Sequence, residues 1–86
     1  MPENVRRVVA KDREVYEAIG ARKGPVYALQ VSMFVACTKM QVELFGPNRA
    51  TMATFAENLL HCFGLQPQDY DEFLQNAAII RKAQML

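Results

Sequence analysis

Hydrophobic residues recur along most of this chain at intervals of three and four residues, the spacing that places them on one face of an α-helix. Three short clusters of turn-forming residues interrupt the pattern and divide it into four segments. Glycine is common just after the end of a helix, and proline is common at its start. The pattern therefore predicts four helices joined by turns at Lys23-Gly24-Pro25, Gly46-Pro47-Asn48 and Gly64-Leu65-Gln66-Pro67.

The first segment has two interpretations. Residues 5–10, Val-Arg-Arg-Val-Val-Ala, are expected to form a short strand, followed by a helix from Asp12 to about Arg22. The same apolar positions also fit one long helix that begins near Glu3. Both interpretations stay open at this point.

The second segment, residues 26–45, contains no glycine, proline, asparagine or aspartate and predicts one helix of about 30 Å. Its main apolar stripe is expected to face the core of the chain, and it consists of Val26, Leu29, Met33, Cys37, Met40 and Leu44. A narrower apolar arc lies on the opposite side and consists of Ala28, Val31, Val35 and Val42. Three other short helices are too few to cover both sides, so we expect the narrower arc to be the interface with a partner chain.

The third segment begins at Asn48, a good N-cap residue, and its apolar positions are Met52, Phe55, Ala56, Leu59, Leu60 and Phe63. The fourth begins near Pro67, has acidic residues in its first turns, and is expected to bury Tyr70, Phe73, Leu74, Ala77 and Ile80. The sequence therefore predicts an all-α fold. It is one small four-helix domain over residues 1–86, with the open option of one short N-terminal strand that pairs in a dimer.

Composition supports a folded domain and suggests that it needs additional stabilisation. The chain has 86 residues, of which 51% are hydrophobic and 22% are charged. A chain this short buries a smaller share of its surface than a larger domain, so small domains often add a disulfide, a metal or a second chain. Cys37 and Cys62 both lie in apolar helical patterns and are expected to be buried thiols. Self-association as a dimer is therefore the expected source of the missing stability.

The sequence predicts no catalytic or metal-binding constellation. The single histidine, His61, is followed directly by Cys62, and adjacent residues on a helix point about 100° apart. There is no C-x-x-C motif and no glycine-rich phosphate loop. The acidic residues at 69, 71 and 72 lack the glycine of a calcium-binding loop. We therefore expect neither enzymatic activity nor a metal or cofactor.

Charge and hydropathy indicate which partners and which location in the cell are expected for the protein. The net charge is +1, which gives no general reason to bind an anionic membrane or nucleic acid. No apolar run approaches the ~20 residues of a membrane span, and the first residues do not resemble a targeting peptide. A cytoplasmic protein that does not enter membranes is expected.

The basic residues are concentrated before the first turn. The predicted order of short strand, helix, glycine-containing turn and apolar helix over residues 5–45 resembles the ribbon-helix-helix family of DNA-binding proteins. That resemblance implies a dimer whose paired N-terminal strands enter the major groove of DNA. The residues that would then contact DNA are Arg6, Arg7, Arg13, Arg22 and Lys23.

Two hypotheses of function follow. The first is a non-enzymatic helical interaction protein, which is a self-associating adaptor, inhibitor or small subunit that binds a protein partner through an apolar helical surface. The second is a dimeric DNA-binding regulator of the ribbon-helix-helix type that uses the basic N-terminal segment.

Overall fold

The computed structural model describes residues 2–85, apart from the side chains of residues 8 and 9. Its helices are α1 (Glu3–Lys23), α2 (Pro25–Phe45), α3 (Arg49–Cys62) and α4 (Tyr70–Gln84), and a single 3-10 turn, η1 (Pro67–Asp69), precedes α4. The described residues contain no strand. The prediction of an all-α fold with four helices is confirmed.

The short strand predicted over residues 5–10 is wrong, because these residues belong to α1, which runs without a break from Glu3 to Lys23. A strand needs a neighbouring strand to receive its backbone hydrogen bonds, whereas a helix satisfies them within its own segment. No neighbouring strand is present in the described chain. The alternative interpretation, one long helix from about Glu3, is the one that the structure bears out.

Two glycines end the first two helices. Gly24 and Gly46 have φ angles of 99° and 82°, a backbone conformation that residues with a Cβ rarely adopt. The amide of Gly24 donates to the carbonyl oxygen of Gly20 at 2.8 Å, and that of Gly46 donates to the carbonyl oxygen of Val42 at the same distance. Pro25 directly follows Gly24 as the first residue of α2, so α1 and α2 are joined by a single residue.

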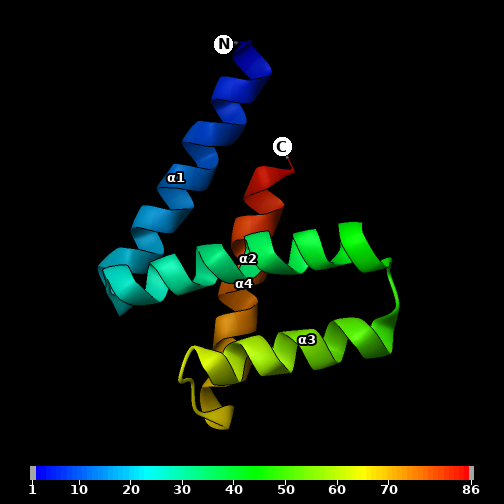
Figure 1. Cartoon of the computed structure of the whole chain (residues 1–86). Coiled ribbons are helices and arrows are strands. Elements are labelled where there is room, and N and C mark those ends of the chain that lie inside the picture. The colour runs from blue at the N-terminus through cyan, green and yellow to red at the C-terminus, as the bar shows by residue number, and fades with distance from the viewer. Residues whose placement is uncertain (1, 86) are drawn as a thin grey trace.

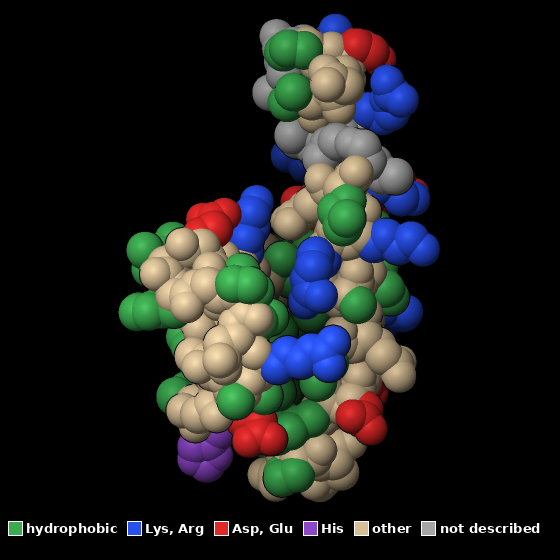
Figure 2. All heavy atoms as spheres, turned by 90° about the vertical axis from the view of Figure 1, so that its right-hand side faces the viewer, with side chains coloured by type: hydrophobic (Ala, Val, Ile, Leu, Met, Phe, Trp, Pro, Cys, Tyr) green, Lys and Arg blue, Asp and Glu red, His purple; other side chains and the backbone are tan. Residues whose placement is uncertain are grey.

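The four helices form two layers (Figure 1). In that view α2 and α3 lie in front and run in opposite directions, α4 crosses behind both of them, and α1 slants away from the end at which α2 begins. Helix α2 packs against each of the other three, and α1 also packs against α4. The first turns of α1 extend beyond the rest of the molecule, as the column at the top of Figure 2 shows.

The core lies between the two layers and is centred on Phe73 of α4, which is completely buried. The rings of Tyr27 and Phe34, both on α2, meet the Phe73 ring edge-on at centroid distances of 5.5 and 5.4 Å. The ring of Phe63 lies 6.2 Å away from it. Edge-to-face aromatic packing contributes about 0.5–1.5 kcal/mol per pair beyond the area that is buried. The other buried members of the core are Ile19, Ala28, Val31, Val35, Leu60, Ala77 and Ile80.

Within residues 2–85, none of the helices combines the length and the apolar character that crossing a lipid bilayer requires.

Candidate functional site: the outer face of α2

The main feature of the surface is an apolar stripe that runs along α2 on the side away from the core. Its large side chains are exposed by between 45% at Met33 and 68% at Val26 and Leu44. We call this surface the outer face of α2, and it consists of Val26, Leu29, Met33, Ala36, Met40 and Leu44. Figure 2 views α2 from its C-terminal end, and hydrophobic side chains protrude at the left edge, the side that corresponds to the front of Figure 1.

The structure therefore exchanges the two sides of α2 relative to the sequence prediction. Ala28, Val31 and Val35, which were expected at a partner interface, are 0%, 0% and 3% exposed inside the chain's own core. Val42 is half-buried. The assignment of Ala28, Val31 and Val35 to an interface is corrected, because these side chains already lie in the chain's own core.

Small residues and one aromatic residue explain why this side of α2 faces the core. Gly20 of α1 lies against Ala28, so that a Cβ built on Gly20 would meet the Ala28 Cβ at 3.6 Å. Two small residues let the helices approach closely, and the single-residue turn at Gly24 fixes this side of α2 toward α1. On the same side, Phe34 is 2% exposed and fills the space beside Phe73. The sequence prediction counted the apolar positions of α2 and did not take these differences in side-chain size into account.

The outer face carries no charged side chain. The first fourteen residues of α2, 25–38, contain no acid or base, and the helix has only Lys39 and Glu43 as charged residues. Along the outer face from Val26 to Met40 the intervals are three, four, three and four residues. This is the spacing of the seam on which one helix packs against another in a coiled coil.

A separate groove lies on the opposite side of α2 from this face, between the second half of α2 and the end of α4. Its volume is about 520 Å³. Val42 contributes to the wall of the groove. The charged residues that line the groove carry both signs, and they are Lys39, Glu43 and Arg81. It is lined by Val35, Thr38, Lys39, Val42, Glu43, Met52, Arg81, Gln84 and Met85.

The five basic residues proposed to contact DNA are distributed along the length of α1. Arg6 and Lys23 lie seventeen residues apart, which is about 25 Å along a helix. Arg6 pairs with Glu3 at 3.2 Å, and Arg13 approaches Glu17 at 4.0 Å. Arg7 is exposed.

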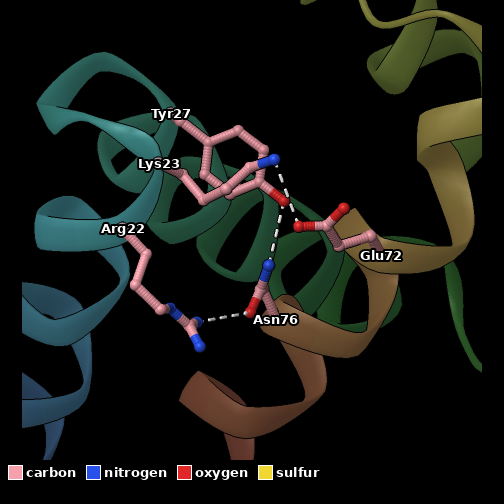
Figure 3. Close-up of polar contacts among 5 residues, drawn as sticks. All are labelled: Arg22, Lys23, Tyr27, Glu72 and Asn76. Atoms are coloured by element: carbon pink, nitrogen blue, oxygen red, sulfur yellow. Dashed lines mark hydrogen bonds and ion pairs between the residues drawn. The ribbon is translucent and has the colours of Figure 1, made fainter.

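The remaining two basic residues take part in contacts that hold α1 to α4 (Figure 3). An Arg22 guanidinium nitrogen donates to the side-chain oxygen of Asn76 at 3.3 Å, and the Lys23 ammonium lies 3.2 Å from a Glu72 carboxylate oxygen. Lys23 also lies over the ring of Tyr27, 5.2 Å from its centroid. Arg22 and Lys23 are therefore engaged within the chain.

Asn76 is the buried centre of these contacts, with 5% of its surface exposed. Its amide nitrogen donates to the Tyr27 hydroxyl oxygen at 2.9 Å. Replacing Tyr27 with phenylalanine should lower the free energy of unfolding by about 1–3 kcal/mol, because the buried amide of Asn76 then loses its partner. Urea denaturation followed by circular dichroism measures this loss.

Tyr16→Phe is the matched control for that measurement, because the described contacts include no hydrogen bond to the Tyr16 hydroxyl. We expect this control to change the free energy of unfolding by less than about 0.5 kcal/mol. Equal effects of the two substitutions would show that the Tyr27–Asn76 contact does not stabilise the fold.

The cysteine and histidine side chains considered for catalysis or metal binding do not form one site. Cys37 is half-buried, and Cys62, which was expected to be buried, is exposed at the last residue of α3. His61 is exposed beside it. Among the described residues, no group of three or more histidine, cysteine, aspartate or glutamate side chains lies close enough to hold a metal ion.

Comparison with protein-family models, with curated proteins and with solved structures found no match to this chain.

Proposed function

We propose that this chain is a non-enzymatic helical interaction protein that binds a protein partner through the outer face of α2. The observation that supports this is the outer face itself, five large apolar side chains that are each 45–68% exposed in one continuous stripe. Single exposed apolar residues are ordinary on protein surfaces, whereas a contiguous apolar patch marks a binding surface.

The spacing of the outer face favours a helix as the partner element. The side chains from Val26 to Met40 repeat as they do in a coiled-coil seam, and a second helix packs into such a seam. The absence of charge on this face favours a partner surface that is also apolar, because burying a charge against it would leave that charge unpaired.

Site-specific photo-cross-linking in the source cell tests this proposal. A photoreactive phenylalanine analogue replaces Met33 on the outer face, and in a control it replaces Ile79 of α4, which has a similar exposure of 48%. We expect protein adducts to form at position 33 at least tenfold more than at position 79.

Both a second copy of the chain and a different protein count as partners in this test. Adducts in equal amounts at the two positions, or none at position 33, would contradict the proposal that the outer face is a protein-binding surface.

A further inference from the structure

The molecule is thin in the direction in which the two layers stack. Its Cα atoms extend over 37 × 31 × 15 Å, and their radius of gyration is 13.5 Å. A compact chain of this length has a radius of gyration of about 12 Å. The outer face of α2 therefore lies on the broad side of a flat molecule, where a further layer of helices has room to pack.

The area of the outer face suits a pair of identical chains. The fractional exposures of its side chains correspond to roughly 600 Å² per chain, so that two such faces together bury at most about 1,200 Å², the lower end of the range for specific, stable interfaces. An interface with two-fold symmetry brings the same patch together from both chains, so the patch must be complementary to itself. A face without charge meets this requirement, because no like charges are brought together.

The order of residues along the outer face indicates the direction of packing. In a parallel pair, Glu43, which borders the outer face between Met40 and Leu44, would lie close to its own copy, which places two carboxylates near each other. In an antiparallel pair, each Glu43 lies near Val26 of the other chain, at the edge of the interface. Antiparallel packing also sets opposite ends of the two helix dipoles beside each other.

We propose that a second copy of this chain covers the outer face, with the two α2 helices antiparallel and a two-fold axis that passes between Met33 and Ala36. This inference rests on the proposed function, because it names the partner of the same surface. The pairing sets Met33 beside Ala36 of the other chain, a large side chain beside a small one. Leu29 then lies beside Met40 of the other chain.

Cysteine cross-linking tests this arrangement in the full chain. In a background with Cys37→Ser and Cys62→Ser, the double variant Leu29→Cys/Met40→Cys should form a covalent dimer under mild oxidation, because each new thiol faces the other position across the axis. Each single variant should form at most a tenth as much. In the antiparallel pair, two copies of the same position lie eleven residues apart along the axis, about 17 Å, which is beyond the reach of a disulfide.

Ile79→Cys in the same background is the control for random collision, since Ile79 is similarly exposed but lies on α4. If the single variants cross-link as well as the double variant, the helices are parallel and the proposal is wrong. If the double variant cross-links no better than Ile79→Cys, the chain does not pair through this face. In that case, photo-adducts of position 33 with a different protein would still support the proposed function, and their absence would contradict both.

Discussion

Replacing Phe73 with alanine should lower the free energy of unfolding by about 3–5 kcal/mol, because it opens a cavity at the centre of the core. The Phe73 side chain is completely buried, and three other aromatic rings pack around it. Small domains have only about 5–15 kcal/mol of stability in total, so this variant loses a large share of it and should melt at a clearly lower temperature. Thermal denaturation followed by circular dichroism measures the change.

Leu74→Ala is the matched control, because Leu74 is the next residue on α4 and is 39% exposed. We expect it to cost less than about 1 kcal/mol. Similar melting temperatures for the parent chain and the Phe73→Ala variant would mean that the two layers do not pack around this ring.

Replacing Met33 with lysine should weaken self-association at least 100-fold and leave the monomer folded. The two-fold axis places one lysine from each chain near the centre of the interface, where neither finds an acidic partner, and two like charges are brought close together. Met33 is 45% exposed in the single chain, so a lysine there reaches water once the chains separate. Light scattering measures the mass, and circular dichroism confirms the helical content.

Ile79→Lys adds the same charge at a similarly exposed position on α4 and should leave the mass unchanged. If both variants keep the mass of the parent chain, the outer face is not the interface. If the measured mass of both variants falls toward that of a single chain to the same extent, the added charge acts without regard to position, which also contradicts the assignment.

The helices and their ends were largely predictable because local chemistry determines them. The glycines that end α1 and α2 and the proline that begins α2 are read directly from the sequence. The same holds for Asn48, whose side-chain oxygen accepts a hydrogen bond from the amide of Thr51 at 3.0 Å at the start of α3. Capping and turn geometry depend on a few neighbouring residues, so no tertiary information is needed.

The first helix was harder to predict, since a run of valines fits either a strand or a helix. The outcome depends on whether another strand is available, and that is a property of the whole fold. The described chain offers none. The resemblance to ribbon-helix-helix proteins depended on that strand, so the DNA-binding hypothesis loses the element that would enter the groove.

The surface expected for a partner was placed on one side of α2, and the structure leaves the other side of that helix exposed. Counting apolar positions identified two faces of α2, and the larger stripe was assigned to the core. The structure buries the side that carries Ala28 and Phe34, because helix packing depends on shape and close approach as well as on hydrophobicity. Gln41, which is polar in the sequence, is also only 5% exposed in the fold.

Sedimentation equilibrium of the purified chain, from low micromolar to about 1 mM, tests most directly whether a second copy occupies the outer face. We predict a mass that rises with concentration toward twice the 9.8 kDa of a single chain. A mass that stays at 9.8 kDa over the whole range would contradict the proposal that the chain pairs through this face.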